Sequence, residues 1–130
     1  MIRLLVPTIL SLLLCGQPAN PTMGSLFNAV AIVESNKNDV AVGDNGKSFG
    51  RYQIQKPYWE DSRVPGEFMQ VKDKEYAEKV MIAYWQRYCP TALANHDFEV
   101  LARVHNGGPK GHKKEATKKY WAKVRQKMRC

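Results

Sequence analysis

The sequence predicts one α+β domain that is mostly helical and carries one small β-hairpin at a cleft. Apolar residues recur at helical spacing in four stretches, near residues 25–35, 73–89, 97–105 and 113–128. Between the first two stretches, residues 40–54 combine glycines with strand-forming residues, which is typical of a hairpin. At 130 residues, with 44% hydrophobic and 25% charged residues, the chain has the composition of a single globular domain with one modest core.

The start of the chain has the pattern of a secretory signal peptide. Arg3 precedes an uncharged apolar run over residues 6–15, and small and polar residues follow. The run is too short for a comfortable transmembrane helix, and the prolines in and after it disfavour a buried helix. We therefore expect a signal peptide over residues 1–19 and one mature domain over residues 20–130, secreted or periplasmic.

Cysteine usage fits an exported protein. Removal of the signal peptide removes Cys15 and leaves Cys89 and Cys130, an even pair in an oxidising compartment. The pair is a candidate disulfide, and two unrelated thiols are the alternative that the sequence leaves open. Because His and Cys do not cluster at metal-ligand spacing, we expect no metal and no cofactor.

The first helix is expected to end in a functional acid. Ser25 is the expected N-cap, and Glu34 falls in the last turn. The partial negative charge of the helix C-terminus and apolar neighbours both disfavour a charged carboxyl there, so Glu34 would keep a proton for donation. One buried stripe of this helix is formed by Leu26, Ala29, Val30 and Val33.

The hairpin over residues 40–54 carries a second acid, Asp44, at its tip. Gly43, Gly46 and Gly50 permit the turn geometry. Asp44 has two interpretations: an ordinary turn residue, or a carboxylate that faces Glu34 across a cleft. The expected strand residues are Val40, Val42, Phe49 and Tyr52.

Three further helices complete the expected fold. The strongest covers residues 73–89 and is stopped by Pro90, the next is capped by Asp97, and the last begins near Lys113. The core face of the first of these is expected to be Tyr76, Ala77, Val80, Met81, Tyr84 and Tyr88. The buried face of the last is expected to be Ala116, Tyr120, Trp121, Val124 and Met128.

The net charge of +8 is concentrated at the end of the chain, where residues 110–129 hold nine Lys or Arg and the single acid Glu115. A basic surface attracts polyanions, and for an exported protein a bacterial wall or an anionic membrane surface is favoured over nucleic acid. A solvated helix face without a specific partner is the alternative. We expect a monomer without a nucleic-acid partner or a stable membrane anchor.

Several motifs resemble one family. Val-Glu-Ser at residues 33–35, Asp-x-Gly at residues 44–46 and Tyr-Gln-Ile at residues 52–54 occur in the same order as in invertebrate-type, destabilase-like lysozymes. The second half adds His-Asn-Gly-Gly-Pro-Lys-Gly at residues 105–111 and Thr-x-x-Tyr-Trp-x-x-Val at residues 117–124. The resemblance places the chain in the wider lysozyme-like and lytic transglycosylase superfamily and implies a lysozyme-like fold.

The resemblance implies an exported glycoside hydrolase that cleaves the β-1,4 glycan strands of peptidoglycan. Glu34 is then the general acid and Asp44 the second carboxylate, the two groups that glycoside cleavage requires. Invertebrate-type lysozymes are usually rich in disulfides, whereas this chain lacks most of those cysteines. The residues that the resemblance places along the glycan groove are Ser48, Tyr52, Gln53, His105, Asn106 and Tyr120.

Two other functions remain open on the sequence. A lytic transglycosylase would use Glu34 alone, first as acid and then as base, and would not need Asp44. A non-catalytic cationic wall-binding protein would act through the basic segment and would not need Glu34. Isopeptidase activity, reported for some relatives, is neither supported nor excluded by a Ser/His/acid spacing here.

Overall fold

The computed structural model describes residues 20–129 and confirms the mostly helical α+β fold. The expected signal peptide and Cys130 lie outside these residues. Within them, the helices are α1 Met23–Ser35, α2 Lys56–Ser62, α3 Lys74–Tyr88, α4 Pro90–Ala94, α5 Phe98–Gly107 and α6 Lys118–Arg129. The strands are β1 Val42–Gly43, β2 Ser48–Phe49 and β3 Ile54–Gln55, and short 3-10 segments are η2 Phe68–Lys72, η3 Gly111–Lys113 and η4 Glu115–Thr117.

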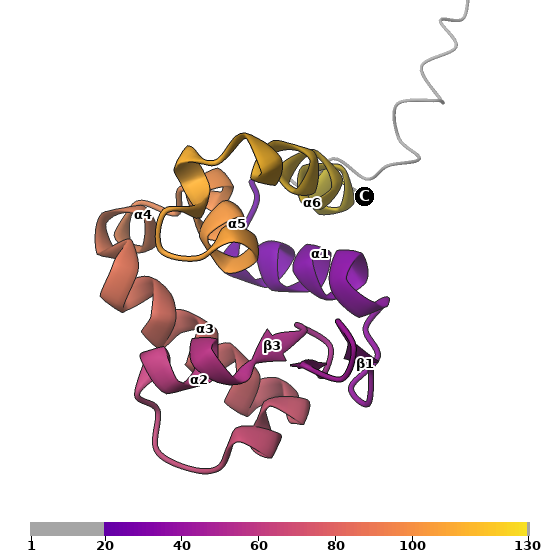
Figure 1. The fold of residues 1–130 in the computed structure, drawn as a ribbon. Coiled ribbons are helices and arrows are strands. Elements are labelled where there is room, and N and C mark those ends of the chain that lie inside the picture. Colours follow the sequence, from indigo (N-terminus) through magenta and orange to yellow (C-terminus); the bar gives the residue numbers. More distant parts are fainter. Residues whose placement is uncertain (1–19, 130) are drawn as a thin grey trace, which may run out of the picture.

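The elements form two groups joined by α3 (Figure 1). Helix α1 packs against α6, and α6 packs against α5, in the upper part of the view. The small sheet leads into α2, which packs against α3 in the lower part. Between residues 20 and 129, no helix is long and apolar enough to cross a membrane.

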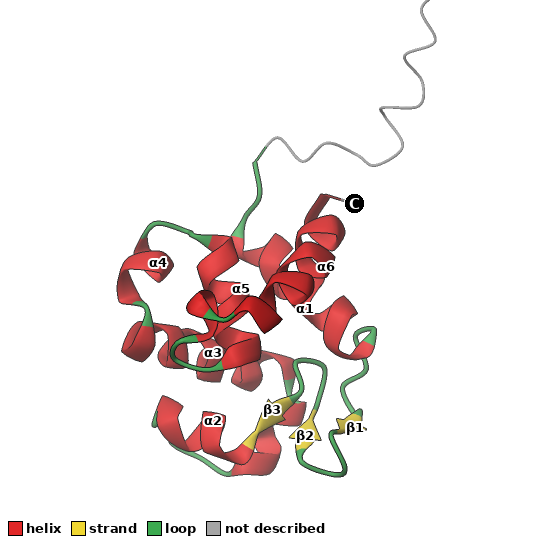
Figure 2. Ribbon diagram, turned by 45° about the horizontal axis from the view of Figure 1, so that its top comes forward, coloured by secondary structure: helices red, strands yellow, loops and turns green. Residues whose placement is uncertain are grey.

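The sheet has one strand more than the expected hairpin. Strands β1, β2 and β3 are antiparallel neighbours in chain order, with Phe49 opposite both Val42 and Ile54 (Figure 2). A second tight turn after β2, with Gly50 at φ 78° and Gln53 at φ 52°, makes the third strand possible. Of the expected strand residues, Val40 lies outside the strands and is exposed, and Tyr52 lies in this turn with its ring in the core.

Helix α1 begins three residues before the sequence predicts. Thr22, not Ser25, is the N-cap: its hydroxyl accepts from the Ser25 N–H at 3.1 Å. The Ser25 hydroxyl accepts in return from the Thr22 N–H at 3.0 Å, which completes a capping box. At the other end, Asn36 adopts a left-handed φ of 55° and ends the helix, so Glu34 lies in the last turn as predicted.

Helix α3 forms as predicted, with Asp73 as its N-cap, but Pro90 does more than stop it. Pro90 opens the short helix α4, because the first helical position needs no N–H donor. Asp97 caps α5 as predicted, its carboxylate accepting from the Val100 N–H at 3.3 Å.

The last helix begins at Lys118 rather than near Lys113. The intervening residues form η3 and η4, which are tied down by Thr117: its hydroxyl donates to the Gly111 carbonyl at 2.7 Å and accepts from Arg103 Nε at 2.8 Å. These bonds bury Thr117, whereas Ala116, predicted to be buried, is exposed. Gly108 and Pro109, just before η3, line the cleft described below.

Trp85, which the predicted core face of α3 omits, is the largest fully buried side chain. Its indole N–H donates to the Leu101 carbonyl at 2.9 Å, so it joins α3 to α5. We expect Trp85→Ala to lower the free energy of unfolding by about 3–5 kcal/mol, because a large cavity opens and the hydrogen bond to the Leu101 carbonyl is lost. Urea unfolding followed by circular dichroism measures this change.

Trp121→Ala is the matched control, since Trp121 is only partly buried against the core. It should cost clearly less than Trp85→Ala. Equal losses would show that burial of Trp85 between α3 and α5 does not stabilise the fold more than the partly buried Trp121 does.

Candidate active site

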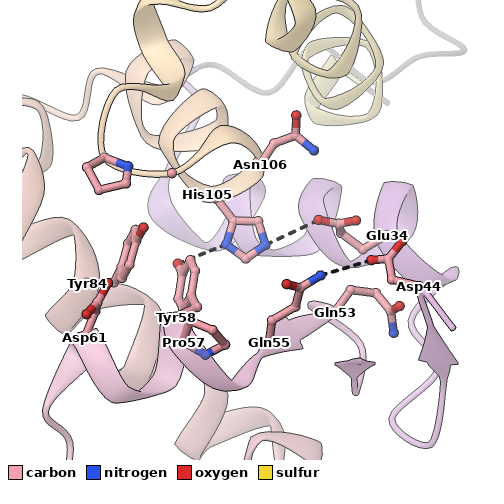
Figure 3. A pocket seen from close by; sticks show the side chains of 12 residues that line it. Glu34, Asp44, Gln53, Gln55, Pro57, Tyr58, Asp61, Tyr84, His105 and Asn106 are labelled. Atoms are coloured by element: carbon pink, nitrogen blue, oxygen red, sulfur yellow. Dashed lines mark hydrogen bonds and ion pairs between the residues drawn. The ribbon is translucent and has the colours of Figure 1, made fainter. Parts of the chain in front are cut away.

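A cleft of about 380 Å³ opens where the end of α1 and the end of α5 face the sheet and α2 (Figure 3). The residues that line it are Glu34, Asp44, Gln53, Gln55, Pro57, Tyr58, Asp61, Tyr84, His105, Asn106, Gly108 and Pro109. Five of the residues that the sequence singles out are therefore brought together: Glu34, Asp44, Gln53, His105 and Asn106.

Glu34 is held at one oxygen by two neighbours. Its side chain is 19% exposed and projects from the last turn of α1. Oε2 accepts from the Tyr120 hydroxyl at 3.2 Å and lies 3.4 Å from Nε2 of His105. Tyr120 comes from α6 and His105 from α5, so both helices that pack on α1 contribute to the placement of this carboxyl.

His105 is 2% exposed at its side chain and is bonded at both ring nitrogens. Nε2 lies 3.0 Å from the Tyr52 carbonyl oxygen, and Nδ1 lies 3.0 Å from the Tyr58 hydroxyl. The Tyr58 ring stacks on Tyr84 at a centroid distance of 3.8 Å and meets the imidazole edge-on. The imidazole of α5 thus contacts α1, the turn before β3 and α2 at one point.

The tyrosines of the site remain protonated at neutral pH. Burial raises the pKa of Tyr58 well above its ordinary value, and the nearby Tyr84, Cys89 and Glu34 add to the shift. Burial, followed by the charge and hydrogen bond of Glu34, does the same to the pKa of Tyr120. Burial raises the pKa of Tyr84 to about 12. The Tyr120 hydroxyl is therefore a hydrogen-bond donor to Glu34 whenever that carboxyl is an acceptor.

Asp44 is exposed, in the loop between β1 and β2. It has φ 49°, a left-handed conformation that Asp and Asn adopt more readily than most residues. Its Oδ2 accepts from the Ser48 hydroxyl at 2.5 Å and from Gln55 Nε2 at 3.4 Å. Figure 3 shows the carboxyls of Glu34 and Asp44 projecting into the same part of the cleft. Asp44 is therefore both a turn residue and a cleft residue.

Three of the residues expected along the groove lie behind its wall. Ser48 is fully buried and holds Asp44. Tyr52 is buried with its hydroxyl donating to Glu78 Oε2 at 2.9 Å, and it contributes only its backbone carbonyl to the site. Tyr120 is buried beneath Glu34. The structure thus gives these side chains supporting contacts, and any contact of theirs with a glycan stays a prediction.

Gln53 and Asn106 line the cleft in different ways. The Gln53 amide nitrogen donates to the Gly50 carbonyl at 2.9 Å, so this side chain also braces the turn after β2. Asn106 is exposed at the end of α5, where it lines the cleft.

Sequence reasoning missed the part of the cleft formed by α2 and α3. Gln55, Tyr58, Asp61 and Tyr84 line it but were not predicted as site residues, and Tyr84 was expected only in the core face of α3. For Gln55 a signal existed, because it directly follows the Tyr-Gln-Ile motif. For the Tyr58–Tyr84 stack none did, since it joins two helices that are distant in the sequence.

The candidate disulfide stays a prediction. Cys89 is buried and forms no bridge within residues 20–129, and its expected partner Cys130 lies outside them. Burial raises the pKa of the Cys89 thiol to about 11, so it is protonated and unreactive in that state. In the same residues, no three His, Cys, Asp or Glu side chains converge in a way that could hold a metal ion.

A mostly helical domain in which a small antiparallel sheet borders this cleft has the fold of the lysozymes, as solved structures show. The chain superposes on an inhibitor-bound lysozyme from Meretrix lusoria with a TM-score of 0.68 and 30% identity, covering 78% of this chain and 87% of the other. For the Tapes japonica lysozyme the TM-score is 0.67, with the same identity and coverage.

The particular family follows from the sequence match. Residues 25–127 match the family model named Destabilase, and the chain belongs to that family. It is 38% identical over 81 residues to a lysozyme of Magallana gigas, covering 61% of this chain and 59% of the relative. It is 34% identical over 85 residues to the invertebrate-type lysozyme of Ruditapes philippinarum, covering 64% and 62%. The chain thus spans about three fifths of these relatives' length, and the resemblance predicted from its motifs is confirmed.

Proposed function

We propose that this protein is an exported glycoside hydrolase that cleaves the β-1,4 glycan strands of bacterial peptidoglycan. One observation carries the proposal: two carboxyls of different environment, Glu34 and Asp44, line one cleft. Relatives of the same family are named lysozymes, which favours the same chemistry here.

The two carboxyls suit different roles. Cleavage of a glycosidic bond needs one protonated carboxyl at the leaving oxygen and one carboxylate near the oxocarbenium-like centre or its attacking water. Glu34, largely withdrawn from water at the end of α1, suits the acid. Asp44, exposed and accepting hydrogen bonds from Ser48 and Gln55, suits the anion. Export is supported by the signal-peptide pattern of residues 1–19.

Mass spectrometry of the products from purified peptidoglycan tests this function. A hydrolase adds water and leaves reducing ends, whereas a transglycosylase leaves anhydro ends that are lighter by one water. We expect reducing ends. Anhydro ends would indicate a lytic transglycosylase in which Glu34 acts alone, and intact strands that still bind the protein would indicate a non-catalytic wall-binding protein.

The exposed lysines of α6 are expected to aid encounter with an anionic wall. Replacing Lys118, Lys119 and Lys123 with Gln should weaken wall binding at low salt, while cleavage of short neutral chito-oligosaccharides stays almost unchanged. Because the Debye length is about 10 Å at 0.1 M salt, the difference from the parent should shrink as salt rises. Sedimentation of the protein with purified walls over a salt series measures it.

The matched control replaces the exposed lysines Lys37, Lys74 and Lys79, which lie outside α6, with Gln. Both variants lose the same charge, so only a local surface effect separates them. If the control weakens wall binding equally, net charge rather than the α6 surface is responsible. An equal loss on neutral oligosaccharides would instead place the α6 lysines in the groove or the fold.

A further inference from the structure

The two oxygens of Glu34 have different surroundings. Oε2 accepts from the Tyr120 hydroxyl at 3.2 Å and lies 3.4 Å from His105 Nε2. Within residues 20–129, no side chain is hydrogen-bonded to Oε1. One oxygen is therefore fixed by the protein, and the other is left for the cleft.

The hydrogen on His105 can be assigned from its partners. The Tyr52 carbonyl oxygen, 3.0 Å from Nε2, can only accept, so Nε2 carries a hydrogen. On the other side of the ring, the Tyr58 hydroxyl stays protonated and can donate to Nδ1 at 3.0 Å. When Tyr58 donates to Nδ1, the hydrogen of the imidazole lies on Nε2, which is 3.0 Å from the Tyr52 carbonyl oxygen and 3.4 Å from Oε2 of Glu34.

The same contacts leave His105 no capacity to bind a sugar hydroxyl. Both ring nitrogens have protein partners, and only 2% of the side chain is exposed. The ring edge borders the cleft, but the polar atoms that would recognise a glycan are used within the protein.

We propose that His105 is a positioning residue: together with Tyr120 it fixes Oε2 of Glu34, so that Oε1 is the oxygen that delivers the proton. This inference rests on the proposed function and refines the role of the same site. It replaces the groove contact that the resemblance implies for His105 with a supporting role within the cleft wall.

The arrangement has a simple chemical consequence. Because lone pairs of Oε2 accept from Tyr120 and face the His105 N–H, the acidic proton of Glu34 lies on Oε1. In the reaction it moves from Oε1 to the glycosidic oxygen, which also takes the electrons of the breaking C–O bond. The charge left on Glu34 is then met at Oε2 by the Tyr120 hydroxyl, a donor already in place, and by the positive end of the His105 N–H 3.4 Å away, without reorganisation.

Steady-state kinetics of His105→Ala, His105→Gln and Tyr58→Phe on solubilised peptidoglycan strands test the proposal. For His105→Ala we expect kcat to fall about 10- to 100-fold, since a misplaced catalytic group costs of that order, with KM within about twofold of the parent. His105→Gln, whose amide N–H₂ can reach the same two acceptors, should recover part of kcat. Tyr58→Phe removes the partner of Nδ1 and should lower kcat while keeping the ring that stacks on Tyr84.

The pH profile separates positioning from folding. The ionisable groups around Glu34 are Tyr120 from α6, His105 from α5, Tyr58 beyond it on α2, and Asp44 in the β1–β2 loop. Loss of the His105 donor destabilises the Glu34 carboxylate, so the alkaline limb of the kcat profile should move to higher pH. Tyr76→Phe is the matched control: it removes a phenol hydroxyl bonded to Trp59 and the Pro65 carbonyl, away from the cleft, and should leave limb and kcat unchanged.

Each other outcome overturns the inference in its own way. A raised KM with parental kcat would make His105 a substrate contact. A loss at every pH that follows the fraction of folded protein, measured by thermal melting, would make its role structural. If Glu34→Gln is inactive and His105→Ala and Tyr58→Phe keep the parental kcat and limb, only this inference fails. If Glu34→Gln matches the parent, the proposed function fails with it.

Discussion

Glu34→Gln is expected to lower the rate of peptidoglycan cleavage by at least about 10²–10⁴-fold, because an amide cannot donate the proton that general acid catalysis requires. The fold should survive, since the amide oxygen of Gln can accept from the Tyr120 hydroxyl as Oε2 does and can lie beside His105 Nε2 in the same way. The rate of release of soluble glycan from purified walls measures the loss, and circular dichroism with thermal melting checks the fold.

The matched control is Glu60→Gln, which removes the same charge from an exposed position on α2. It should keep the parental rate. If Glu34→Gln also keeps the parental rate, the glycosidase proposal is rejected, because that proposal makes Glu34 the proton donor and Asp44 the carboxylate.

The position of Glu34 at the end of a helix can be predicted from the sequence, whereas the start of the same helix and the residues packed around Glu34 cannot. The position of an acid in the last turn of a helix depends on local periodicity and on the polar residues that follow, and both are visible in the chain. Helix starts are less certain, because a cap depends on which hydroxyl reaches the first free N–H groups. Thr22 and Ser25 each have such a hydroxyl, and only the structure shows that both are used.

The groove residues show the limit of a motif. A motif tells which residues gather near a site, but not which side of the wall each side chain occupies. Gln53 has φ 52°, so the chain reverses direction beside it, and Tyr52 is directed into the core against Phe27. The Tyr58–Tyr84 stack depends on how α2 packs on α3, which no local pattern specifies. The supporting shell of the site is thus a product of tertiary packing.

The contacts of Asp44 go beyond what a turn residue needs. A turn alone requires only a residue that tolerates φ 49°, and Asn satisfies that as well as Asp. Ser48 is fully buried, yet it donates to this exposed carboxylate at 2.5 Å, and Gln55 contacts both. Because the buried Ser48 hydroxyl fixes one orientation of the Asp44 carboxylate, we infer that the negative charge of Asp44 has a role in the cleft.

Asp44→Asn should therefore lower hydrolysis by about 10²–10³-fold, the order expected when one preorganised electrostatic contact with the transition state is lost. The Asn oxygen can still accept from Ser48 and Gln55, so the loop and substrate binding should persist and kcat should fall with little change in KM.

Asp39→Asn is the control: it removes a carboxylate that pairs with Arg51 at 2.7 Å at the surface, a contact worth about 0–1 kcal/mol, and should keep the parental rate. Kinetics on soluble strands with mass spectrometry of the ends decides the mechanism. Should Asp44→Asn stay active and release anhydro-ended sugars, Asp44 serves the turn alone and Glu34 acts first as acid and then as base.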